Sequence, residues 1–241
     1  MAQLGRYLTE NEKNYREKRS EIISEIDSQL IADNPFLFAN RITVTESIAR
    51  YELFKKILNI SGAIIECGVH NGNNLLFFSH LSSILEPYAI NRKIVGFDTF
   101  EGFRSIKDQD PDDIDEDNFD NVNIKALEDA ISLYDMNRAA SHMNRVEIIK
   151  GDAVETIDNY VQKNPALTVA LLYLDFDIYE PTKVALEKLF PLVCKGGVVA
   201  FDEFNYEKFP GETEAVKEFF QLNDIKVERF YFDPFIGYII V

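Results

Sequence analysis

The chain has few cysteines, few basic residues and no long apolar run, and each shortage excludes a class of protein. Two cysteines, Cys67 and Cys194, are too few for a disulfide framework, so we expect reduced thiols. The longest apolar run, Val169–Leu174, is much shorter than the roughly 20 residues of a membrane-spanning helix. The segment Met1–Glu12 is polar and lacks the apolar core of a secretion signal. These features favour a cytoplasmic protein without a membrane partner.

The shortage of basic residues leaves the chain strongly acidic. Its 241 residues include 25 Lys and Arg against 41 Asp and Glu, which gives a formal net charge of −16 at pH 7. Nucleic acids and anionic membranes would repel such a surface, so we expect neither as a partner. The composition is 46% hydrophobic, which is enough to bury a core and excludes global disorder.

Apolar residues recur at helical intervals through the first 60 residues. One helix is predicted over Tyr15–Leu30 and a second, amphipathic helix over Thr45–Leu58, with Asn34-Pro35 as a break between them. We therefore divide the chain into a helical N-terminal extension or lid over residues 1–60 and a second domain over residues 61–241.

Short apolar strands alternate with helices in the second domain, which predicts a doubly wound α/β sheet with right-handed crossovers. The predicted strands cover residues 63–67, 93–98, 146–150, 169–174 and 197–202. The predicted helices cover residues 73–85, 124–134, 154–162, 182–192 and 213–222. Two further strands, 227–232 and 237–241, are joined by a linker too short for a parallel crossover, so they should form an antiparallel hairpin. The predicted sheet therefore has seven strands.

Carboxylates stand at the ends of the first three predicted strands. Glu66, Asp98 and Asp152 occupy these positions, and the carboxyl ends of parallel strands line the crevice where open α/β sheets bind ligands. Gly68 and Gly72 allow a ligand to approach the backbone closely at a helix N-terminus. The acid Glu66 suits a cationic or zwitterionic ligand there. The competing interpretation is that each acid caps the helix that follows it.

A further set of carboxylates follows the fourth and fifth strands. Asp175, Asp202 and Glu203 should converge at neighbouring strand ends. Such crowding of like charges is unfavourable unless a cation lies among them, and hard oxygen ligands select Mg²⁺ or Ca²⁺. The alternative is that helix N-termini and lysines neutralise these acids.

The segment Asp108–Asp120 holds eight carboxylates in thirteen residues. A run of like charge is usually a solvated loop, which is the first interpretation. A calcium site is the alternative, because Asp108, Asp110 and Asp112 have the spacing that opens an EF-hand loop. Asp113, however, stands where that loop requires glycine.

Four blocks of sequence carry a more specific signal. They are residues 65–69 (IECGV), 97–103 (FDTFEGF), 174–182 (LDFDIYEPT) and 196–203 (GGVVAFDE). Together they resemble class I S-adenosylmethionine-dependent methyltransferases and, more narrowly, the macrocin O-methyltransferase (TylF-type) family, over about residues 43–241. The resemblance implies a Rossmann-like fold and a reaction that uses S-adenosyl-L-methionine and Mg²⁺ or a similar divalent cation.

The resemblance also implies roles for individual residues by their positions. The implied cofactor-binding residues are Glu66, Gly68 and Gly72 around the methionine part, Asp98 at the ribose, Thr99 and Phe100 beside the adenosine, Asp152 and Ala153 at the adenine, and Arg50 at the carboxylate. The implied metal ligands are Asp175, Asp202 and Glu203, although the family usually has two aspartates where this chain has Asp202 and Glu203. Asp175 is the preferred catalytic base, with His70 and His142 as alternatives.

The implied reaction is methyl transfer to a sugar hydroxyl, on a nucleotide-linked deoxysugar or a glycoside, in natural-product or surface-polysaccharide biosynthesis. The resemblance further implies a homo-oligomer. Two other functions stay open. One is a catechol-type O-methyltransferase for a small aromatic acceptor, with Phe204, Tyr206 and Phe209 near the acceptor pocket. The other is a non-catalytic relative of the fold that binds no cofactor.

Overall fold

The computed structural model describes residues 9–117 and 119–241. The expectation that Met1–Glu12 is not a secretion signal therefore falls mostly on residues outside the described part of the chain. Two compact units are present: the first ends at Glu46, and the second covers Ser47–Val241. No helix among the described residues has the length and apolar character needed to cross a membrane.

The described part of the first unit is helical, but the single helix predicted over residues 15–30 is wrong. α1 (Glu10–Glu25) ends at Ile26, whose backbone is extended. Asp27 then begins α2 (Ser28–Asp33) by accepting two backbone N–H bonds in its first turn. The break arises from this N-cap aspartate, a signal that apolar spacing alone does not carry.

α3 (Arg41–Ile57) crosses the boundary between the units, and most of its length belongs to the second. Ala49, Leu53 and Phe54 on this part of the helix are fully buried. Their packing puts the boundary between the units inside the helix, earlier than the expected boundary at residue 60.

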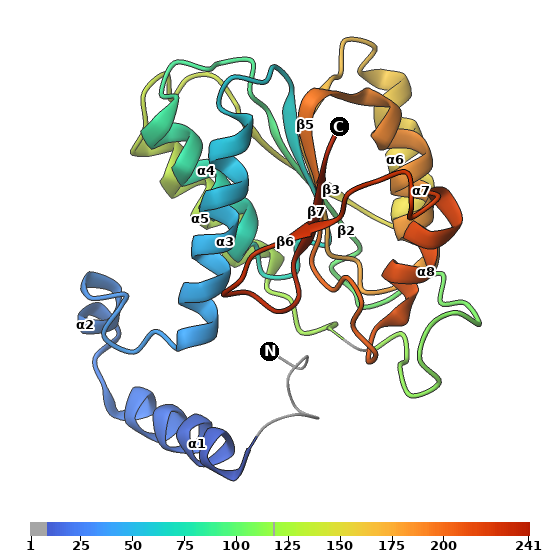
Figure 1. Cartoon of the computed structure of the whole chain (residues 1–241). Coiled ribbons are helices and arrows are strands. Elements are labelled where there is room, and N and C mark those ends of the chain that lie inside the picture. Colours follow the sequence, from blue (N-terminus) through green and yellow to red (C-terminus); the bar gives the residue numbers. More distant parts are fainter. Residues whose placement is uncertain (1–8, 118) are drawn as a thin grey trace. The chain divides into compact units, whose positions relative to one another are not determined.

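The second unit is built on a seven-stranded sheet with the strand order β3-β2-β1-β4-β5-β7-β6 (Figure 1). The strands are β1 (Ala63–Cys67), β2 (Ile94–Asp98), β3 (Val146–Lys150), β4 (Val169–Leu174), β5 (Val193–Phe201), β6 (Glu228–Arg229) and β7 (Gly237–Ile240). Strands β1 to β5 are parallel, and β7 runs antiparallel to both β5 and β6. The predicted Rossmann-like sheet with its C-terminal hairpin is confirmed.

Helices cover both faces of this sheet (Figure 1). On one face lie α4 (Asn73–Leu85), α5 (Ile124–Met136) and the buried part of α3, and on the other lie α6 (Ala153–Lys163), α7 (Tyr179–Leu189) and α8 (Pro210–Phe219). Two separate apolar clusters fill the two layers, with Ile64 in one and its neighbour Ile65 in the other. Consecutive residues of a strand point to opposite faces, so each strand contributes to both cores.

Several predicted boundaries in the second unit are wrong, including the start of β5, which begins at Val193, four residues before the predicted start. Three of the differences have a clear local reason. α7 begins at Tyr179, three residues before the predicted start, because the Asp110 carboxylate accepts the Tyr179 N–H at 2.7 Å. α8 begins at Pro210, where proline suits the first turn of a helix. β6 has two residues instead of six, since Asp233 accepts the N–H groups of two following residues and turns the chain before β7.

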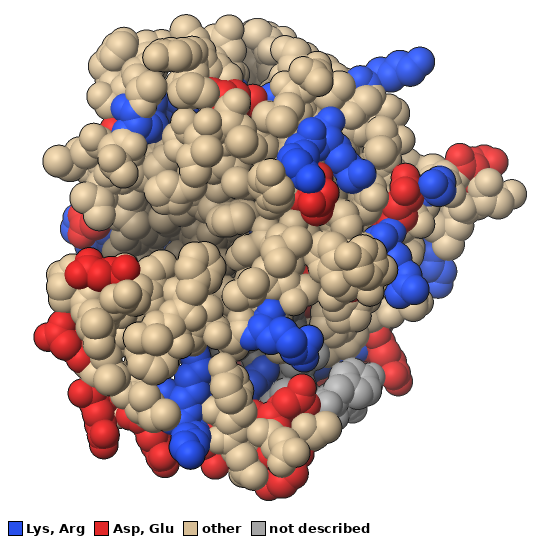
Figure 2. Space-filling model, turned by 60° about the vertical axis from the view of Figure 1, so that its left-hand side comes forward, with Lys and Arg blue, Asp and Glu red and all other residues tan. Residues whose placement is uncertain are grey.

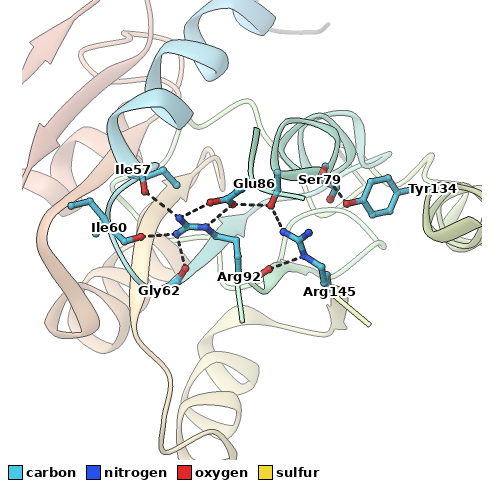
Figure 3. Close-up of polar contacts among 9 residues, drawn as sticks. Ile57, Ile60, Gly62, Ser79, Glu86, Arg92, Tyr134 and Arg145 are labelled. Carbon is cyan, nitrogen blue, oxygen red and sulfur yellow. Dashed lines mark hydrogen bonds and ion pairs between the residues drawn. The ribbon is translucent and has the colours of Figure 1, made fainter. Parts of the chain in front are cut away.

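At the amino end of the sheet, the buried Arg92 side chain connects three elements (Figure 3). Its guanidinium donates to the carbonyls of Ile57, Ile60 and Gly62 and pairs with Glu86 at 2.8 Å. Ile57 ends α3 and Gly62 directly precedes β1. One side chain therefore holds the end of α3 against the start of the sheet.

Replacement of Arg92 with methionine is expected to lower the free energy of unfolding by about 3–5 kcal/mol, because the largely buried Glu86 carboxylate, whose side chain is 12% exposed, loses its cation. The matched control, Lys55→Met, breaks an exposed ion pair with Glu52 and should leave stability nearly unchanged. Chemical denaturation of both variants measures the two effects. Equal stability of the variants would contradict the role assigned to Arg92.

Candidate active site

The ends of the five parallel strands each carry an acid, and backbone hydrogen bonds align these ends. The N–H of Asp175 donates to the Cys67 carbonyl at 2.7 Å, and the N–H of Asp202 donates to the Leu174 carbonyl at 2.9 Å. In the order of the sheet, the acids are Asp152, Asp98, Glu66, Asp175 and Asp202. The structure therefore brings the predicted acids together along one edge of the sheet.

Two glycines shape the backbone beside this row. Gly68 has a φ of +97°, and a Cβ at this position would lie 1.9 Å from the carbonyl oxygen of Asp175. Gly72 has a φ of +83° at the N-cap of α4, where a Cβ would lie 2.2 Å from a Leu127 methyl group. Both positions require glycine, because a side chain would be strained and would collide. The turn between β1 and α4 is thus held close to the tip of β4.

Glu66 is fully buried at the centre of the row. Neither of its carboxylate oxygens has a hydrogen-bond partner of good geometry within the described residues, although the nearby Asn74 amide acts to lower its pKa. Burial raises the pKa of Glu66 well above the usual range; Arg50 opposes that effect and Asp98 adds to it. A buried acid in this state is a ready acceptor for a ligand that brings its own positive charge.

The Asp98 carboxylate organises the loops on either side of it. One of its oxygens accepts the N–H groups of Val69 at 2.7 Å and His70 at 2.8 Å, and the other accepts the N–H of Phe100 at 2.6 Å. His70 and Phe100 both have positive φ angles, which these bonds help to hold. A carboxylate offers about four acceptor positions, so one remains for a ligand hydroxyl.

The other predicted cofactor residues lie along the same loops. Thr99 donates its hydroxyl to the Gly102 carbonyl, and Phe100 is buried. Asp152 caps α6 by accepting the Val154 N–H at 2.9 Å, as the competing interpretation expects, and it also accepts the Ser105 hydroxyl. Ala153 is buried as the first residue of α6.

Arg50 reaches this edge from α3. The residue is 3% exposed, and its guanidinium donates to Asp202 Oδ1 at 3.3 Å and lies 5.5 Å from the centroid of the Tyr173 ring. The Tyr173 hydroxyl donates to the same Asp202 oxygen. Arg50 therefore forms a buried ion pair with an acid at the end of β5.

The acids predicted as metal ligands are close enough to affect one another. Burial raises the pKa values of Asp175 and Glu203 well above normal, and their acidic neighbours raise them further. Burial also raises the pKa of Asp202, against the opposing effect of Arg50. Across residues 9–117 and 119–241, no three Asp, Glu, His or Cys side chains come together in the arrangement of a metal site. The oxygen donors are gathered here, but Asp202 faces Arg50 and Tyr173.

Sequence reasoning missed two buried acids in this cluster. Asp177 has a φ of +64° and raises the pKa of both Asp175 and Glu203. Glu212, in the first turn of α8, accepts the N–H of Glu203 at 3.1 Å. Asp177 could have been found from the sequence, because it follows Asp175 by only two residues. Glu212 could not, because many exposed acids also stand in the first turn of a helix.

One of the eight carboxylates in the acidic segment after β2 anchors that segment to the rest of the unit. Asp110 is 6% exposed and accepts the N–H groups of Lys107 at 2.8 Å and Tyr179 at 2.7 Å. Burial raises its pKa. Gly211 leaves space for this contact, because a Cβ there would lie 2.2 Å from the Asp110 carboxylate. The solvated-loop interpretation holds for Asp112, Asp113, Glu116, Asp117 and Asp120, which are exposed.

Replacement of Glu66 with glutamine is expected to stabilise the chain increasingly as pH rises. The folded-state pKa of Glu66 is raised, so its contribution to stability is present at low pH and lost as pH rises through that pKa. Glutamine does not ionise and escapes this loss. Thermal unfolding between about pH 5 and about pH 8 should show a gap over wild type that widens with pH.

The control for this measurement is Glu187→Gln, on the exposed side of α7. Its unfolding midpoint should follow that of wild type at each pH. A constant gap between Glu66→Gln and wild type would show that Glu66 ionises normally in the folded chain.

Among the solved structures that this chain resembles, two are of one protein, and a third is a more distant relative. The crystal structure of CalS11, described as a calicheamicin methyltransferase, is 29% identical with a TM-score of 0.90, and the match covers 97% of this chain and 94% of that chain. An apo structure of CalS11, described as TDP-rhamnose 3'-O-methyltransferase, has a TM-score of 0.83 at 28% identity, covering 97% of this chain and 96% of that chain. The O-methyltransferase NovP shares the fold, with a TM-score of 0.63 and 21% identity over 82% of this chain and 79% of that chain.

No curated protein matches the chain significantly. A family model does: the model described as Macrocin-O-methyltransferase (TylF) matches residues 19–238. This span includes both units in part and every acid of the strand-end row. The chain belongs to the macrocin O-methyltransferase (TylF) family and is an O-methyltransferase that uses S-adenosylmethionine.

Proposed function

We propose that the chain transfers a methyl group from S-adenosylmethionine to a sugar hydroxyl, with a divalent cation such as Mg²⁺ assisting. The observation that carries the proposal is the buried Glu66 carboxylate, which directly precedes the turn shaped by Gly68 and Gly72, in a chain that is 29% identical to CalS11. The sugar acceptor is inferred from CalS11, which is described as a TDP-rhamnose 3'-O-methyltransferase. A nucleotide-linked deoxysugar is therefore the first acceptor to test.

The residues around Glu66 fit the cofactor. S-adenosylmethionine, when bound, supplies a methyl group activated by a positively charged sulfur. Among the described residues, no cation lies at hydrogen-bonding distance from Glu66. Its carboxylate can therefore accept hydrogen bonds from the ammonium group of the cofactor. Gly68 and Gly72 give the turn between β1 and α4 its shape next to Glu66, where the methionine part would lie, and the remaining acceptor position of Asp98 suits a ribose hydroxyl. Thr99, Phe100, Asp152 and Ala153 would surround the adenosine.

The metal part of the proposal is supported by donor chemistry. Asp175, Asp202 and Glu203 supply hard oxygen ligands, and each has a pKa raised by burial and by acidic neighbours. A divalent cation would relieve that repulsion and would act as a Lewis acid on the acceptor hydroxyl. Arg50 and Tyr173 hold one oxygen of Asp202, which leaves the other for a further partner.

Asp175 is the proposed base for the acceptor proton. It lies at the tip of β4, between Glu66 on β1 and Asp202 on β5, and is only partly buried. The Asn74 amide donates to one of its oxygens at 3.4 Å. This contact orients the carboxylate and leaves its second oxygen for a proton. The free thiols Cys67 and Cys194 agree with a reducing cytoplasm as the place of the reaction.

An aromatic acceptor is the second candidate, because an apolar cluster forms from the loops beyond the strand ends. Phe103, Ile178, Tyr206 and Phe209 are its buried members. A small aromatic ring could pack against such a cluster, as a catechol-type methyltransferase requires. Turnover of catechols but of no sugar nucleotide would replace the sugar proposal with this one.

The first test measures methyl transfer from S-adenosylmethionine to nucleotide-linked deoxysugars, with and without EDTA. Activity should be lost in EDTA and return with added Mg²⁺. Undiminished turnover in EDTA would remove the metal from the proposal. Calorimetric titration with S-adenosylhomocysteine separates an enzyme from a non-catalytic relative, because the latter would show no binding.

Substitution of two acids separates cofactor binding from chemistry. Asp175→Asn should lower kcat by roughly 100-fold or more, because the proton loses its acceptor. Asp202→Asn should likewise lose most of its activity. Both variants should bind S-adenosylhomocysteine with nearly the wild-type Kd, whereas Glu66→Gln should weaken that binding by at least about tenfold. A large loss of binding in Asp175→Asn would contradict its assignment as the base.

A further inference from the structure

Glu212 stands in the first turn of α8 and is completely buried, with 0% exposure. An acid in a first helical turn is favoured by the helix dipole and is ordinarily solvated, as are the acidic side chains at the surface in Figure 2. Glu214, in the same helix, is of that kind, because its side chain is 44% exposed and pairs with Lys217. The helix dipole explains why an acid suits this turn, but it does not explain why Glu212 is buried.

The burial of Glu212 is unfavourable in itself. Only one of its two carboxylate oxygens has a hydrogen-bond partner of good geometry within the described residues. Burial raises the pKa of Glu212 well above the usual range; the Glu203 N–H opposes this effect, and the nearby Asp202 and Asp177 add to it. A buried acid among other acids lowers the stability of a fold. The contribution of Glu212 therefore lies in what its bonded oxygen holds.

The bonded oxygen of Glu212 holds the peptide group between two acids. This atom, Oε1, accepts the N–H of Glu203 at 3.1 Å. That N–H belongs to the planar peptide group that joins Asp202 to Glu203. Fixing the direction of this plane restricts ψ of Asp202 and φ of Glu203, and the relative direction of the two side chains depends on these two angles. Glu212 therefore restricts how the two carboxylates can be directed relative to each other.

Other groups hold the backbone on either side of this peptide group. The N–H of Asp202 donates to β4 at 2.9 Å, and the N–H of Asn205 donates to the Thr213 hydroxyl at 2.8 Å. Thr213 follows Glu212 directly, so the first turn of α8 holds the segment after β5 at two points. Loss of the Glu212 carboxylate would free the plane between Asp202 and Glu203 while these other bonds stay in place.

The helix that carries Glu212 is itself fixed in position. α8 lies beside α7 (Figure 1), and Gly211 lets the two helix starts approach closely, because a Cβ there would lie 2.6 Å from the Tyr179 nitrogen. Ala215 and Val216, in the next turn of α8, are fully buried. Glu212 is therefore supported by packed helices, as a group that positions others requires.

We propose that Glu212 is a positioning residue, which holds the peptide group between Asp202 and Glu203 and so keeps both carboxylates directed for one divalent cation. This inference rests on the proposed function, in which Asp202 and Glu203 bind that cation. Glu212 acts through the backbone of Glu203 and needs no contact with the cation or with the acceptor. Groups that orient metal ligands in this way contribute to metal affinity without being ligands themselves.

The test measures binding of Mn²⁺ to the full-length chain with S-adenosylhomocysteine present, from the electron paramagnetic resonance signal of the free ion. Glu212→Met keeps a long buried side chain but has no oxygen to accept the Glu203 N–H. It should raise the Mn²⁺ Kd by roughly tenfold or more, because the carboxylates are no longer held in one direction. Glu212→Gln keeps an acceptor oxygen, so its Kd should stay within about threefold of wild type.

The matched control is Glu214→Met, which replaces an acid of the same helix that pairs with Lys217. It should bind Mn²⁺ as wild type does. Thermal unfolding and calorimetric titration with S-adenosylhomocysteine accompany each variant. Glu212→Met should unfold near the wild-type midpoint and bind S-adenosylhomocysteine normally, because removal of a buried acid offsets the loss of one hydrogen bond.

An unchanged Mn²⁺ Kd in Glu212→Met would overturn the positioning role and leave the proposed function intact. An equal loss of affinity in Glu212→Met and Glu212→Gln would also overturn it, because the bond to the Glu203 N–H would then not be the cause. A Glu212→Met chain that no longer unfolds cooperatively or binds S-adenosylhomocysteine would show that Glu212 serves stability instead. A wild type that binds no Mn²⁺ would overturn this role together with the metal part of the proposed function.

Discussion

Crowding of carboxylates along one edge of a parallel sheet is the constraint to which the rest of this structure responds. Parallel strands all end at the same edge, so acids at their ends cannot avoid one another. The chain meets this repulsion differently at each position. Asp98 receives three backbone N–H groups, Asp202 receives Arg50 and Tyr173, and Glu66 is left buried with a strongly raised pKa. Glu66, which the protein itself leaves without a hydrogen-bonded cation among the described residues, is therefore suited to a positively charged ligand.

The arrangement depends on supports outside the acidic row. Arg50 can reach Asp202 because α3 is packed on the sheet through Leu53 and Phe54 and is held at its end by Arg92. Gly68 lets the turn between β1 and α4 approach the end of β4 closely. Glu66 and Asp175 are therefore near enough that the charge of Glu66 raises the pKa of Asp175. The amino edge of the sheet therefore provides rigidity, and the carboxyl edge provides chemistry.

Much of this could be predicted from the sequence, and the failures have a common cause. The strands were predicted well because both-face burial produces apolar runs, and α4 was predicted with its observed bounds because Gly72 marks its start. The acids at the strand ends were placed correctly because parallel topology fixes their edge. What escaped prediction are contacts between distant residues, such as Arg50 with Asp202, which are 152 positions apart. The same holds for Asp110, which caps α7 from an unrelated loop. Local patterns carry no information about such pairs.

The attachment of the acidic loop through Asp110 affects which parts of the chain can change during evolution. Asp110 fastens the loop to the start of α7, and Gly211 of α8 makes space for that anchor. The exposed acids beyond it, including Asp112 and Glu116, take no part in fixing α7. Substitutions, insertions and deletions in this outer portion can therefore be sampled during evolution while the reaction centre stays constant. One buried aspartate thus separates an exposed outer loop from the start of a helix that borders the strand ends.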